Sequence, residues 1–123
     1  MKENEIKDIK NQVEYKGNVY NLVFNLNVMQ EIQEEYGTIE KWGSLTDGTS
    51  GEVNIKALIY GFMKMLNEGI EIQNEDEGTE IKPFTEKQVG RMITEIGLEK
   101  MAQTLSKTVI ESTKSDDETP KNL

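Results

Sequence analysis

The residues of this sequence most able to do chemistry are its carboxylates, because 23 Asp and Glu stand against 14 Lys and Arg, a formal net charge of −9. Glu31 and Glu35 are spaced i, i+4 and would share one face of a helix. A carboxylate pair that cleaves glycosides needs one member in a dry pocket with a raised pKa. Glu31 and Glu35 instead fall on the polar side of an amphipathic pattern, which indicates a solvated face.

Loops that bind calcium or phosphate are the other sites that residue spacing could indicate. The spacing in this sequence fits neither kind of loop. An EF-hand loop requires glycine at position 6 and glutamate at position 12, but Phe84 falls at position 12 if Gly78 is position 6. Gly48 and Gly51 lack the spacing and the strand–loop–helix setting of a phosphate loop. We therefore predict no catalytic, metal or cofactor-binding residue. Weak divalent-cation binding by residues 71–80 is the alternative that this spacing leaves open.

The residue types that are missing exclude several classes of function. The chain has no cysteine and no histidine, so disulfides, thiolate chemistry, imidazole bases and histidine-ligated zinc are excluded. The acidic balance, with Arg91 as the sole arginine, argues against nucleic-acid binding. No apolar run approaches the roughly 20 residues of a membrane span. The composition predicts a soluble, intracellular, non-enzymatic protein.

The elements that must position these residues are an N-terminal β-hairpin and about five helices, which is a mainly α-helical fold. Two runs rich in β-branched and aromatic residues, 13–15 and 19–24, flank Lys16-Gly17-Asn18, which is a hairpin signal. Helical periodicity begins near Asn27 and recurs to Val109. The residues that we expect to cap or break the helices are Asn25 or Asn27, Gly37, Thr38, Gly43, Asn54, Gly69, Thr85 with Gln88, and Gly97.

The acids are concentrated between residues 68 and 80, which hold six of them and no base. We expect this segment to be an exposed loop, with a short strand at Ile70–Ile72. Residues 13–111 are predicted to form a single domain. Residues 1–12 are predicted to be a flexible segment, and residues 112–123, which lack periodic apolar residues, a disordered tail.

Three residues are candidates for contact with a partner protein. Met65 flanks the apolar stripe of its helix, and methionine suits adaptable binding surfaces. Tyr60 lies outside the same stripe. Trp42 is the only tryptophan, and the sequence leaves open whether it fills the core or anchors a partner.

The order of these features resembles the tail assembly chaperones of long-tailed phages and prophages of Gram-positive bacteria. The resemblance covers about residues 13–110. It rests on the hairpin and on the segments that follow it along the chain. These are NLVFNLNVMQEIQEEYG at 21–37, a short tryptophan-containing helix, IKALIYGFMKMLNEG at 55–69, PFTEKQVGRMI at 83–93, and a last helix. The acidic segment 68–80 is longer than we expect for this family.

The resemblance implies a protein of the bacterial host cytoplasm that binds the tape-measure protein during tail assembly, with tail-tube protein as a second candidate partner. It carries over no catalytic residue. Whether the chain forms a homo-oligomer stays open. Two alternatives are a small structural connector or adaptor protein of the phage particle, and an acidic protein-binding regulator.

Overall fold

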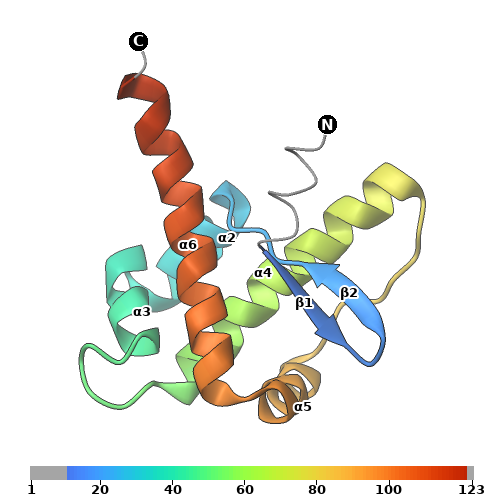
Figure 1. The fold of residues 1–123 in the computed structure, drawn as a ribbon, viewed down its shortest axis with the longest axis horizontal. Coiled ribbons are helices and arrows are strands. Elements are labelled where there is room, and N and C mark those ends of the chain that lie inside the picture. Colours follow the sequence, from blue (N-terminus) through green and yellow to red (C-terminus); the bar gives the residue numbers. More distant parts are fainter. Residues whose placement is uncertain (1–10, 122–123) are drawn as a thin grey trace.

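The computed structural model describes residues 11–121 of the chain, with side chains described for residues 11–112. This range holds a two-stranded hairpin followed by five helices (Figure 1), which confirms the expected mainly α-helical fold with an N-terminal hairpin. The elements are β1 (Gln12–Tyr15), β2 (Asn18–Asn21), α2 (Leu26–Tyr36), α3 (Ile39–Thr46), α4 (Ile55–Glu77), α5 (Glu86–Ile96) and α6 (Leu98–Lys121). The expected flexible segment 1–12 falls largely outside the described residues.

The hairpin forms at the predicted place. Lys16 and Gly17 both have positive φ, at 51° and 81°, as the tight turns that match strand twist require. The strands pair antiparallel, with Val13 opposite Tyr20. Val13 is buried, so the hairpin packs one face on the helices.

Side-chain caps start the helices where the sequence indicates. The side chains of Asn25, Thr38 and Asn54 accept hydrogen bonds from backbone N–H groups in the first turns of α2, α3 and α4. Thr85 and Gln88 form the reciprocal capping box expected at the start of α5. These predictions are confirmed because a cap is a local interaction, readable from neighbouring residues.

Helix α4 is the centre of the domain, in contact with α2, α3, α5 and β2. Because it is covered on several sides, its buried residues form a broad face rather than a single narrow stripe. This face is made of Ala57, Leu58, Gly61, Phe62, Met65, Leu66, Gly69 and Ile70.

Two glycines of α4 allow very close contacts. A methyl group on Gly61 would overlap the indole ring of Trp42, and one on Gly69 would overlap the backbone carbonyl of Asn21. The chain leaving β2 therefore lies directly against α4, where the Val23 N–H donates to the Met65 carbonyl oxygen at 3.2 Å.

The prediction that Gly69 ends the third helix is wrong, as is the exposed loop with a strand at Ile70–Ile72. Helix α4 continues through Glu77 and ends at Gly78, which is left-handed with φ 72°. Gly69 serves the contact with β2 rather than a helix end, and Ile70 continues the buried face. Of the six acidic residues, Glu68 is half-buried, Glu80 follows the helix, and the other four are exposed on its last turns.

Two asparagines hold the segment between α4 and α5 against α4. The Asn74 side chain bonds both the N–H and the carbonyl of Ile81, each at 3.0 Å. The Asn67 side chain bonds both backbone groups of Phe84 in the same way, at 2.8 and 3.0 Å. Phe84 then packs edge-on against Tyr20 of the hairpin, with ring centroids 5.2 Å apart.

Two further boundaries differ from expectation. Helix α3 runs past Gly43 to Thr46, and the N–H of Asp47 still donates to the Gly43 carbonyl. Helix α6 continues through Lys121, although residues 112–123 were expected to be a disordered tail. Extending an existing helix costs far less than starting one, so α6 does not need apolar residues in every turn.

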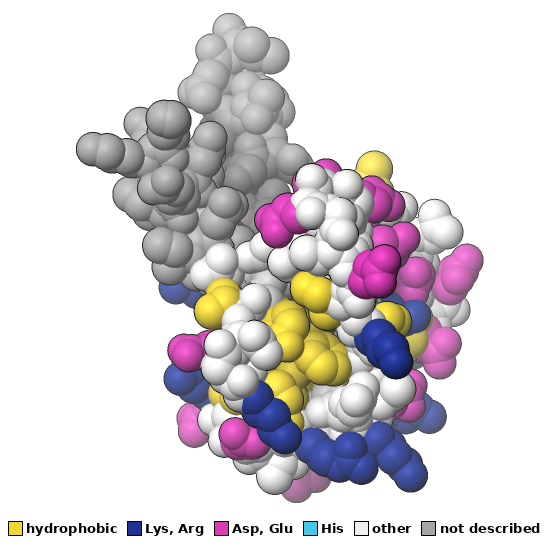
Figure 2. All heavy atoms as spheres, turned by 90° about the vertical axis from the view of Figure 1, so that its right-hand side faces the viewer, with side chains coloured by type: hydrophobic (Ala, Val, Ile, Leu, Met, Phe, Trp, Pro, Cys, Tyr) yellow, Lys and Arg dark blue, Asp and Glu magenta, His cyan; other side chains and the backbone are white. Residues whose placement is uncertain are grey.

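Charge and hydrophobic side chains are unevenly distributed over the surface. On the face shown in Figure 2, hydrophobic side chains gather in the middle, acidic side chains lie above them, and Lys and Arg side chains lie mainly below. The hairpin and the α4–α5 segment lie on this side of the molecule (Figure 1). They contribute the partly buried Tyr20, Ile81 and Phe84.

We predict that Gly69→Ala destabilises the domain by about 3 kcal/mol, because the new methyl group must displace backbone rather than a flexible side chain. The matched control is Gly90→Ala in α5, where the methyl group would lie 3.7 Å from Ile59 Cδ1, an ordinary contact. That variant should be unchanged or up to ~1 kcal/mol more stable, since alanine favours helix. Urea unfolding of both variants measures the difference. Equal stabilities would contradict the close contact at Gly69.

Candidate functional site

Helix α6 presents two different faces to the rest of the domain. Met101, Leu105 and Thr108 are buried against the body. A second row along the same helix, at spacing i, i+4, faces open space towards α3 and the α3–α4 loop. It consists of Leu98, Ala102, Ser106 and Ile110.

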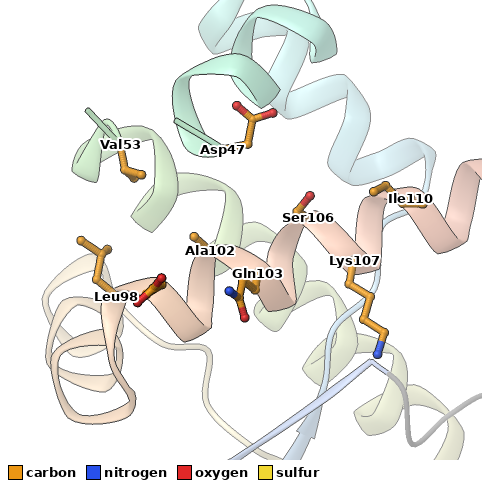
Figure 3. Close-up of a pocket in the computed structure, with 9 residues that line it drawn as sticks. Asp47, Val53, Leu98, Ala102, Gln103, Ser106, Lys107 and Ile110 are labelled. Carbon is orange, nitrogen blue, oxygen red and sulfur yellow. The ribbon is translucent and has the colours of Figure 1, made fainter. Parts of the chain in front are cut away.

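This second row forms one wall of a groove of about 720 Å³, and Asp47 and Val53 lie on the opposite side (Figure 3). Ala102, Ser106 and Ile110 project towards the side that carries Asp47 and Val53. The complete lining is Asp47, Val53, Leu98, Glu99, Ala102, Gln103, Ser106, Lys107 and Ile110. We call this the α3–α6 groove.

The groove continues into a smaller cavity of about 200 Å³ beneath α3, which shares Asp47, Ser106 and Ile110 with it. Ile39, Trp42 and other α3 residues line this inner end. Since α6 rises about 1.5 Å per residue, the row from position 98 to position 110 is about 18 Å long. The groove therefore matches the length of about three turns of a helix.

The α3–α4 loop that forms the opposite wall is held by hydrogen bonds. The Asp47 carboxylate accepts from the Thr49 N–H at 2.9 Å. The Asn54 N–H donates to the Leu45 carbonyl at 2.8 Å, which closes the base of the loop. The wall that carries Val53 is thus fixed from both ends.

The groove combines a mostly apolar row with a few charged residues. Its charged residues are Asp47, Glu99 and Lys107, and its remaining lining is apolar or neutral. Within residues 11–112, no group of acidic side chains is arranged to hold a metal ion. A surface of this length, apolar along one row and charged at its edges, can accept the apolar side of an amphipathic helix.

A second groove, of about 700 Å³, lies between α4 and α5 and meets the first at Leu98. Its apolar lining includes Ile55 and Ile59, and its charged residues are Lys87 and Arg91. The two grooves together give one continuous, partly apolar surface around the start of α6.

Two of the three predicted contact residues are buried. Trp42 is 2% exposed, and its indole N–H donates to the Ala57 carbonyl at 3.0 Å. Of the two roles left open for Trp42, the structure supports core filling. Met65 is 0% exposed, at the point where the β2 exit crosses α4. Neither side chain is available to a partner in this fold. The sequence did not reveal the burial of Met65, because the chain that leaves β2 and crosses α4 there is distant in sequence.

Tyr60 is half-buried and joins α4 to α2. Its hydroxyl donates to the Glu31 carbonyl oxygen at 3.0 Å, and its ring packs edge-on against Tyr36. Burial raises the pKa of Tyr60, and the Glu31 carboxylate adds to this while Lys64 opposes it. Lys64 itself pairs with Glu31 at 2.6 Å, and that hydrogen bond raises the lysine pKa. Tyr60 therefore acts as a link between helices, and the structure does not bring it together with Trp42 or Met65.

The residues that line the groove were mostly missed by sequence reasoning. The sequence predicts a last helix in this region, but it does not single out Leu98, Ala102, Ser106 or Ile110 as a binding row. An available signal was the i, i+4 row of small and apolar residues beside the buried Met101 and Leu105. The opposite wall is formed by residues at the α3–α4 loop, and the spacing of apolar residues in a sequence does not predict where a loop lies in space.

A comparison with protein-family models, with curated proteins and with solved structures finds no match to this chain. No helix in the described part of the chain is both long enough and apolar enough to cross a membrane.

We predict that Tyr60→Phe lowers stability by about 1 kcal/mol near pH 7, through loss of the hydrogen bond to Glu31. Because the pKa of Tyr60 is raised in the folded state, its contribution to stability is complete below pH 10.0, the ordinary tyrosine pKa. That contribution is lost as pH rises through the folded-state pKa. The gap in unfolding free energy between wild type and variant should therefore shrink above about pH 10. Urea unfolding across this range measures it. A gap that stays constant or widens would contradict the assignment.

Proposed function

We propose that this chain is a non-enzymatic tail assembly chaperone that binds a helix of the phage tape-measure protein in the α3–α6 groove, in the cytoplasm of the bacterial host. Two lines of support meet here. The order of sequence features over residues 13–110 resembles that family. The groove is a helix-sized, partly apolar surface, and it is the observation that carries the proposal.

The physical properties of the chain suit this role. A client with long amphipathic helices aggregates through its apolar side, so a holding protein must cover that side and stay dispersed. Leu98 and Ile110, 39% and 57% exposed, offer apolar contacts at the two ends of the groove. The net charge of −9 keeps copies of the protein apart while each covers a stretch of client.

Many weak sites on one long client also give tight overall binding. A helix laid in an 18 Å groove engages only about three turns, which limits the affinity of each copy. Several copies on successive stretches of one chain gain from effective concentration. A modest groove is therefore adequate for this function.

We predict that the double variant Leu98→Asp/Ile110→Asp loses client binding by about tenfold or more, because two carboxylates replace the apolar ends of the groove. Both side chains are exposed, so folding should change by less than about 1 kcal/mol. The measurement is co-expression with the tape-measure protein of the same phage or prophage, followed by the soluble yield and co-purification of that client.

The control is Leu26→Asp/Val19→Asp, which makes the same chemical change at apolar residues outside the groove, 78% and 55% exposed. It should hold the client as wild type does. Retention of the client by the groove variant would contradict the groove as the site. Failure of wild type to bind, together with the chain in finished particles, would favour a structural connector. Binding abolished by salt in all variants would favour an acidic regulator.

A further inference from the structure

A single glycine joins α5 to α6, and helical hydrogen bonds reach it from both sides. The Gly97 N–H donates to the Ile93 carbonyl at 2.7 Å, and the Met101 N–H donates to the Gly97 carbonyl at 3.0 Å. Both are i to i−4 bonds, as in an unbroken α-helix. The interruption lies in the torsions of Gly97 itself, with φ 114° and ψ 129°.

These torsions are accessible to glycine and strained for any residue with a side chain. Space is not the obstacle, because a methyl group on Gly97 would meet no atom within 4 Å. If Gly97 became helical, α5 and α6 would merge into one helix from Glu86 to Lys121. The junction thus has a second, regular conformation that requires change at one residue.

The side of α6 that faces the body includes the buried Thr108 and the partly buried Ala102 and Val109. Met101 and Leu105 are its fully buried apolar residues within the described range. The α3–α6 groove lies along one side of the helix. A cavity of about 430 Å³ lies on the other side, between α6 and the hairpin, with Gly17 and Lys100 in its lining. Helix α6 therefore rests on the body with open space to either side.

We propose that two copies of this chain exchange α6 through straightening at Gly97. In the exchanged dimer, each merged α5–α6 helix carries Met101 and Leu105 onto the body of the other copy. That body is the same surface, so the buried contacts of α6 are recovered in full. The half-buried Ile96 flanks the hinge and lies where the two merged helices cross.

Charge sets the condition under which the exchange occurs. Two chains of net charge −9 repel each other, so low ionic strength favours the monomer and added salt favours the dimer. The α3–α6 groove exists in both forms. In the monomer one chain supplies both walls, and in the exchanged dimer α6 comes from the other copy. The exchange is therefore independent of the proposed function, and either can fail alone.

The test is Gly97→Ala, measured by light scattering on a sizing column. Alanine at position 97 is strained at the positive φ of the monomer and is favoured in the merged helix. Each dimer relieves this backbone strain at two junctions. We expect the dimer dissociation constant to fall by about 100-fold. The control is Gly37→Ala, between α2 and α3, also at positive φ with no atom within 4 Å of the added methyl group. It should stay as monomeric as wild type. A folded, monomeric Gly97→Ala variant would overturn the proposal.

Cross-linking distinguishes exchange from simple surface association. The chain has no cysteine, so Asp47→Cys and Ser106→Cys can be placed on separate Gly97→Ala chains, on opposite walls of the groove. After mixing and refolding, a short thiol cross-linker should join the two different chains, because α6 of one lies on α3 of the other. A dimer without this cross-link would overturn exchange. If Gly97→Ala does not fold, the same pair in the wild-type background, refolded from urea at high concentration and salt, must still give the cross-link.

Discussion

Close contact at two glycines of α4 determines how the rest of the domain is arranged. Without a side chain at Gly61, the indole of Trp42 lies on the helix surface and brings α3 with it. Without one at Gly69, the backbone leaving β2 rests on α4 and bonds to it. The hairpin, α3 and the start of α2 all take their positions from a helix that runs unbroken through both glycines. Backbone approach of this kind is specific, because a single methyl group prevents it.

Polar side chains then fix the irregular segments that apolar packing does not hold. Asn67 and Asn74, two turns apart on α4, each bond the N–H and carbonyl of one residue in the α4–α5 segment. Glu68 accepts from the Asn25 and Asn27 side chains and ties the start of α2 to the same helix. These amide pairs satisfy backbone groups that would otherwise lack partners on leaving water.

Helix α6 is the element least constrained by these contacts, and both proposals concern it. It meets the body through a short buried row and leaves a second apolar row facing α3 across the groove. The incomplete packing that leaves the α3–α6 groove open also lowers the cost of moving the helix. Gly97 localises that movement to one residue, because the hydrogen bonds on either side are already helical.

The sequence alone determined the local features of this protein: the hairpin turn at Lys16-Gly17, the caps at Asn25, Thr38, Asn54 and Thr85, and the break at Gly97. Each depends on residues a few positions apart, whose conformational preferences act in any context. The length of α4, the burial of Met65 and the groove wall at Val53 were decided by tertiary structure. Gly69 ends a helix by local preference, but here it lies within one. The reason is that the backbone of Asn21, distant in sequence, gains its closest packing where no side chain stands.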